Sequence, residues 1–128
     1  MTVVVGYIPD QFGEAALTAG LEEAGRRGTD LVVVNASKGD ALVDRRYVGE
    51  TAMTALQDRL SGTDVPFDVR QMIGADVAEE LVRVARETAA EAIVIGLRHR
   101  TPVGKMIMGS VAQQVLLEAP CWVIAVKP

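Results

Sequence analysis

The chain has 128 residues, which is typical of one domain and short for two independent hydrophobic cores, so we expect one domain over residues 1–128. Thirteen lysines and arginines against 17 aspartates and glutamates give a net charge of −4, which argues against nucleic acid or an anionic membrane as partner. No apolar run approaches the roughly 20 residues of a membrane-spanning helix. The first residues lack a signal-peptide pattern and Cys121 is the single cysteine, so we expect a cytoplasmic protein.

The first quarter of the chain has the pattern of a strand, a helix and a second strand. Residues 3–7 are largely β-branched and are followed by the breakers Pro9 and Asp10. Apolar residues then recur at helical spacing as far as Ala24, and Gly25 and Gly28 bracket the predicted helix end. Residues 31–34 form a continuous apolar run. The order predicts two parallel strands joined by a crossover helix.

The middle of the chain opens with a polar segment. Residues 35–48 include Lys38, Arg45 and Arg46 without a sustained period, and we predict a loop at the carboxyl end of the second strand, where ligand sites are common. Beyond it, hydrophobic periodicity predicts a helix over residues 49–60, a strand over 67–72 and a helix over 76–88.

The last third repeats the alternation of strand and helix. We predict a strand over residues 92–96, a helix from Ser110 to about Glu118 and a final strand from Trp122 to Val126, with Pro120 ending the helix. Five apolar strands alternating with four helices specify an α/β fold. Its sheet is open, five-stranded and parallel, with helices on both faces and a ligand crevice at the carboxyl ends of the strands.

The segment between the fourth strand and the last helix, residues 96–110, is rich in glycine and cations. The start of a helix offers unpaired backbone N–H groups and the positive end of the helix dipole, so a loop of this kind before a helix favours bound phosphate. The basic side chains are candidates for phosphate contact, and a solvated basic loop is the alternative. They are Arg98, His99, Arg100 and Lys105.

These residues resemble the nucleotide-binding signature of the universal stress proteins, and the resemblance covers the whole chain. The signature's C-terminal half reads glycine, two residues, glycine, nine residues, glycine, then serine or threonine. Gly96 fits the first glycine and Gly109 with Ser110 fits the final pair, whereas His99 stands in place of the middle glycine. The opening valine-rich strand also matches. The resemblance implies a Rossmann-like sheet with strand order 3-2-1-4-5.

The resemblance also implies an adenine nucleotide, ATP, ADP or AMP, with or without magnesium. The first glycine would let backbone approach ribose and phosphates, and the final glycine and hydroxyl residue would bind phosphate oxygens. Ile8 aligns with an aspartate that recognises adenine or ribose in ATP-binding members, and Asp10 is the nearby alternative carboxylate and the candidate for holding magnesium. The nucleotide site implied is Tyr7, Ile8, Pro9, Asp10, Val34, Gly96, Arg98, His99, Arg100, Lys105, Gly109, Ser110 and Val111.

Three functions are compatible with these observations. The first is a nucleotide-binding regulator or sensor of the stress response without efficient chemistry of its own. The second is a nucleotide-independent interaction module, a homodimer through the apolar final strand from Trp122 to Val126, as the resemblance implies. The third, a slow ATPase or nucleotidyl transferase, has the least support, because no carboxylate pair or metal-ligand cluster accompanies the loop in sequence. We therefore expect no enzyme.

Overall fold

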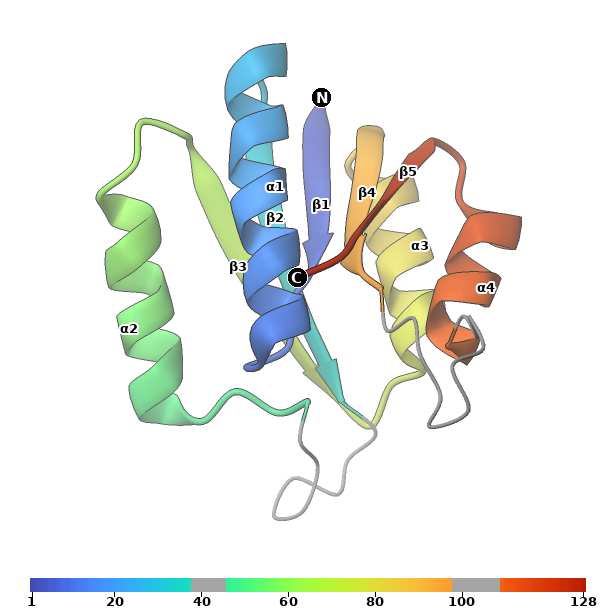
Figure 1. Ribbon diagram of the computed structural model, residues 1–128, viewed down its shortest axis with the longest axis horizontal. Helices are drawn as coiled ribbons and strands as arrows, with labels where there is room; N and C mark the ends of the chain where they lie inside the picture. The colour runs from blue at the N-terminus through green and yellow to red at the C-terminus, as the bar shows by residue number, and fades with distance from the viewer. Residues whose placement is uncertain (38–45, 98–108) are drawn as a thin grey trace.

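The computed structural model describes residues 1–37, 46–97 and 109–128, which form five strands and four helices around one sheet (Figure 1). The sheet order is β3-β2-β1-β4-β5, and every neighbouring pair is parallel. This confirms the predicted fold class and strand order. The elements in chain order are β1 (Thr2–Gly6), α1 (Gln11–Arg27), β2 (Asp30–Ser37), α2 (Glu50–Ser61), β3 (Phe67–Ile73), α3 (Val77–Glu87), β4 (Ala90–Gly96), α4 (Ser110–Glu118) and β5 (Trp122–Val126).

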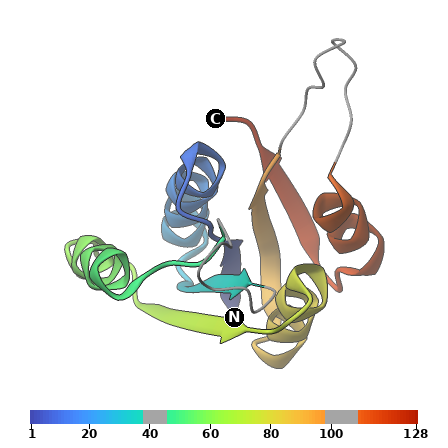
Figure 2. The ribbon, with the colours of Figure 1, turned by 90° about the horizontal axis from the view of Figure 1, so that it is seen from below.

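Helices cover both faces of the sheet, with α1 and α2 on one side and α3 and α4 on the other (Figure 2). Successive side chains of the central strand alternate between two cores because side chains in a strand have a period of two. Val3 and Val5 pack with Leu17 of α1 on one face. Val4 packs with Leu81 of α3 on the other. Among the described residues, no helix is long and apolar enough to cross a membrane.

Helix α1 lies unusually close to the sheet and has a defined start and end. A Cβ at Gly20 would lie 2.2 Å from Cγ2 of Val5, so only glycine permits this approach. Asp10 caps the helix at its start, and Gly28 ends it with a left-handed φ of 66°. These features fix where α1 begins and ends and how closely it packs on β1.

Strand β2 extends three residues beyond its predicted carboxyl end. We predicted that a loop begins at residue 35, whereas Asn35, Ala36 and Ser37 continue the strand and pair with Gln71, Met72 and Ile73 of β3. The loop prediction was wrong at these positions because Asn35 is fully buried with its amide hydrogen-bonded, so its polarity does not end the strand.

Candidate functional site

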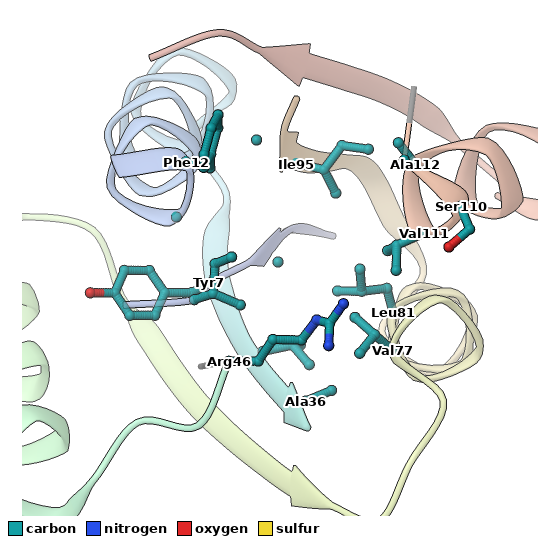
Figure 3. Close-up of a pocket in the computed structure, with 16 residues that line it drawn as sticks. Tyr7, Phe12, Ala36, Arg46, Val77, Leu81, Ile95, Ser110, Val111 and Ala112 are labelled. Atoms are coloured by element: carbon teal, nitrogen blue, oxygen red, sulfur yellow. The ribbon is translucent and has the colours of Figure 1, made fainter. Parts of the chain in front are cut away.

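A cavity of about 220 Å³ opens at the carboxyl ends of β1, β2 and β4 (Figure 3). It lies where the chain order reverses, with β2 on one side of β1 and β4 on the other, which is the usual ligand position in open α/β sheets. The described residues that line it are Gly6, Tyr7, Ile8, Phe12, Gly13, Val34, Ala36, Arg46, Val77, Leu81, Ile95, Gly96, Gly109, Ser110, Val111 and Ala112.

Tyr7 borders the cavity but its side chain points away from it, toward α2 (Figure 3). The Tyr7 hydroxyl donates a 2.6 Å hydrogen bond to Oε2 of Glu14, and the guanidinium of Arg59 in α2 donates to both oxygens of the same carboxylate. Burial and the Glu14 carboxylate raise the pKa of Tyr7 to about 12. The Arg59 hydrogen bond lowers the pKa of Glu14. Tyr7 therefore joins β1 to both helices of this face and stays protonated at neutral pH.

Two glycines allow the first turn of α1 to pack directly on the end of β4 and on the backbone of Ile8, beside the cavity. A Cβ at Gly96 would lie 2.3 Å from the carbonyl oxygen of Phe12, and a Cβ at Gly13 would lie 1.7 Å from the carbonyl oxygen of Ile8. Both distances are far below ordinary van der Waals contact, which begins at 3.4 Å. The glycine at position 96 is therefore required by packing, whatever it does for a ligand.

Asp10 serves as the cap of α1. Its Oδ1 accepts hydrogen bonds of 2.9 Å from the backbone N–H groups of Phe12 and Gly13. Neither Pro9 nor Asp10 is among the residues that line the cavity. No group of three histidine, cysteine, aspartate or glutamate residues within ranges 1–37, 46–97 and 109–128 could hold a metal ion. Asp10 thus caps the helix through Oδ1.

The start of α4 forms the wall opposite α1. Gly109 occupies the cap position without a side-chain cap bond, and a Cβ there would meet nothing within 4 Å. The first turn of α4 contains no acidic residue. Ser110 is exposed, and Ser110 and Val111 both line the cavity (Figure 3). The N–H groups of a first helical turn have no partner within the helix, so this wall favours an anion.

Arg46 enters the cavity from the connection between β2 and α2 (Figure 3). The buried side chain of Asn35 binds the backbone of Arg46 and Val48. Its Nδ2 donates to the carbonyl oxygens of Tyr7, at 3.0 Å, and of Arg46, while its Oδ1 accepts from the backbone N–H of Val48 at 3.1 Å. Nε2 of Gln71 in β3 donates to the same Oδ1 at 2.9 Å.

The structure brings together residues predicted from distant parts of the chain. Tyr7, Ile8, Val34, Gly96, Gly109, Ser110 and Val111 all line the cavity. The predicted residues Arg98, His99, Arg100 and Lys105 lie outside the described part of the chain.

Sequence reasoning missed several lining residues, notably Phe12, Arg46, Val77 and Leu81. The one available signal was for Arg46, because it lies in the basic segment after the second strand. None of the described lining residues is acidic, and Arg46 is the one charged residue among them. The described lining thus supplies apolar surface, one guanidinium, a serine hydroxyl and backbone N–H groups, which are contacts suited to binding.

Comparison with known proteins gives a consistent result. A profile described as "Universal stress protein family" matches residues 1–127. A "Universal stress protein" of Mycolicibacterium smegmatis is 50% identical over 126 residues, covering 98% of this chain and 97% of that protein.

Two solved structures of universal stress proteins from Archaeoglobus fulgidus are also similar. One is 30% identical with a TM-score of 0.78 and covers 99% of this chain and 98% of that one. The other, a complex with dAMP, is 27% identical with a TM-score of 0.68 and the same coverage.

Proposed function

Since the chain belongs to the universal stress protein family, we propose that it binds an adenine nucleotide, ATP, ADP or AMP, in this cavity and acts as a regulator or sensor in a stress response. The observation that carries the proposal is the uncapped start of α4, at Gly109 and Ser110, opening onto a largely apolar cavity at the reversal point of the sheet. The dAMP complex of the similar A. fulgidus protein supports it.

In this proposal the two ends of the nucleotide meet different walls. The base packs against the apolar side chains of Ile8, Val34 and Ala36, and the phosphate approaches the backbone N–H groups at Gly109 and Ser110. We propose binding without efficient turnover, because the described lining offers no carboxylate or histidine as general base. In this proposal magnesium enters bound to the phosphates, because Oδ1 of Asp10 caps α1.

A matched pair of substitutions tests the site. Gly49 and Gly109 both occupy helix cap positions, neither makes a side-chain cap bond, and a Cβ at either would meet nothing within 4 Å. Aspartate is a better cap than glycine by a few tenths of a kcal/mol, so neither Gly49→Asp nor Gly109→Asp should destabilise the fold. Only Gly109→Asp places a negative charge at the cavity.

The assay is the rise in melting temperature caused by ATP, ADP or AMP. A ligand at 100 times its Kd stabilises the folded state by about 2.7 kcal/mol. We expect this stabilisation, measured as a rise in melting temperature, in the wild-type chain and in Gly49→Asp. In Gly109→Asp we expect at least a tenfold loss of affinity, which reduces the stabilisation by about 1.3 kcal/mol or more. Equal rises in melting temperature in the two variants would show that the start of α4 is not part of the nucleotide site.

A second candidate function, a dimeric interaction module that works without nucleotide, is favoured by the exposed edge of the sheet. Strand β5 is an edge strand, and Trp122 at its beginning is 75% exposed. An apolar edge strand left open invites pairing with another chain, so we propose that β5 pairs with β5 of a second copy.

Sedimentation at micromolar concentration tests this pairing. The wild-type chain should sediment as a dimer, and Trp122→Lys should shift it toward monomer. The charge-matched control Gln113→Lys, at an exposed position of α4, should stay dimeric. A monomeric wild-type chain would contradict the proposal. A dimer that shows no melting shift with any nucleotide would favour the interaction module over the sensor.

A further inference from the structure

We propose that Arg46 is a ligand-contacting residue that binds the phosphate of the nucleotide from the side of the cavity facing the start of α4, and that Asn35 is the residue that positions it. This inference rests on the nucleotide binding proposed above and adds a phosphate-selecting residue to that site. It goes beyond the glycine and serine signature, because neither Arg46 nor Asn35 belongs to those motifs.

The first step is the chemical character of the lining. Arg46 is the one charged residue among the described residues that line the cavity, and most of its neighbours there are apolar, including Val77 and Leu81. In Figure 3 its side chain extends into the cavity, in the direction of α3 and the first residues of α4. A guanidinium beside apolar walls interacts more strongly with an anion than one in water does, and its fork of N–H donors matches phosphate oxygens.

The second step is how Arg46 is held. Asn35 is fully buried, and its amide binds the carbonyl oxygen of Arg46 and the N–H of Val48, two residues further on. Gln71 reinforces the arrangement, because its Nε2 donates to Oδ1 of Asn35 at 2.9 Å and to the carbonyl oxygen of Val48 at 2.7 Å. The backbone that carries Arg46 is therefore fixed to two strands. This lowers the backbone entropy that is lost when the side chain binds a ligand.

The same amide also fixes the border of the cavity. Nδ2 of Asn35 donates to the carbonyl oxygen of Tyr7, the residue that follows β1. One buried side chain thus sets the position of Arg46 relative to the strand end that the ligand would contact. A phosphate between Arg46 and the start of α4 would meet two sources of positive potential, a full charge and a helix dipole. The site should therefore bind a nucleotide more tightly than the corresponding nucleoside.

Calorimetric titration with AMP and with adenosine tests the role of Arg46. In Arg46→Gln we expect AMP affinity to fall by about 10- to 100-fold, the usual effect of losing a hydrogen bond to a charged group, and adenosine affinity to change less than about 3-fold. Arg26→Gln is the control, because it makes the same change in net charge on the exposed end of α1. Arg46→Lys should recover part of the AMP affinity.

Two results would overturn the assignment of Arg46. One is an unchanged AMP affinity in Arg46→Gln, and the other is an equal loss for AMP and adenosine, which would place Arg46 at the nucleoside. If the wild-type chain binds neither AMP nor ATP, the proposed function itself fails. If the wild-type chain and the Arg46→Gln variant bind AMP equally well, this inference is overturned and the proposed function is not.

The positioning role needs a readout that a general loss of stability would not produce. Gln71→Ala provides this readout better than Asn35→Ala does. Gln71 is only partly buried and lies on an edge strand, so its replacement leaves the core intact. Gln71→Ala should weaken AMP binding about 3- to 10-fold in the wild-type chain and not at all when Arg46 is already glutamine. An equal loss in both backgrounds would show that the effect does not pass through Arg46.

Discussion

Replacing Gly96 with alanine should destabilise the fold, because this glycine is a packing residue. The added Cβ would lie 2.3 Å from the carbonyl oxygen and 2.7 Å from the carbonyl carbon of Phe12, where contact normally begins at 3.4 Å. The backbone of α1 or β4 must therefore move by about 1 Å. Overpacking of this kind costs about 1–3 kcal/mol. We expect the upper end, because the obstructing atoms are backbone, and about 3 kcal/mol lowers the melting temperature of a chain of this length by about 10 °C.

The assay is urea and thermal unfolding of Gly96→Ala beside Gly25→Ala. Gly25 lies on the exposed side of α1, and a Cβ there would meet nothing within 4 Å, so its replacement should stabilise the helix by about 0.5–1 kcal/mol. The two alanines thus have opposite expected signs. A Gly96→Ala chain as stable as wild type would refute the close approach of α1 to β4. If the destabilisation is found, weaker nucleotide binding in Gly96→Ala does not identify Gly96 as a ligand contact.

The remaining predictions concern the group formed by Tyr7, Glu14 and Arg59. In a Tyr47→Phe background, phenolate absorbance should report a midpoint near pH 12 for Tyr7, and one near 10 would contradict its burial beside Glu14. The pKa of Tyr7 is higher in the folded than in the unfolded state. The protonated hydroxyl therefore contributes to the free energy of unfolding fully below about pH 10, and this contribution is lost as the pH rises through 12. Glu14 behaves oppositely: its folded pKa is lowered from 4.5, so its stabilisation is present above that pH and is lost on acidification. Glu14→Gln should reduce the fall in the urea unfolding midpoint on acidification. The reduction should be modest, because the side chains of Glu14 and Arg59 are about half exposed. An unchanged fall would argue against the contact between Glu14 and Arg59.

The strands could be predicted from sequence because most consist of continuous or alternating apolar residues that only a sheet buries. The end of β2 could not, because Asn35 and Ser37 are polar and only their tertiary setting makes them strand residues. The partners of Asn35 are Tyr7, 28 residues earlier, and Arg46 and Val48, 11 and 13 residues later. Contacts at such separations leave no periodic signal.

The position of the cavity could be predicted because the ends of parallel strands meet at one edge of the sheet. The presence of Leu81 and Arg46 in its wall could not. The periodicity of residues 76–88 correctly indicates that Leu81 is buried but does not show which cavity it borders. The cap formed by Asp10 could be predicted from a local signal, because an aspartate immediately before a helix is a common cap.

The most direct test of the central claim is calorimetric titration of the wild-type chain with ATP, ADP and AMP. Binding in the cavity predicts saturable heat at one nucleotide per chain for at least one of them, abolished or strongly weakened in Gly109→Asp and retained in Gly49→Asp. The absence of heat from all three nucleotides at millimolar concentration would contradict nucleotide binding by this chain.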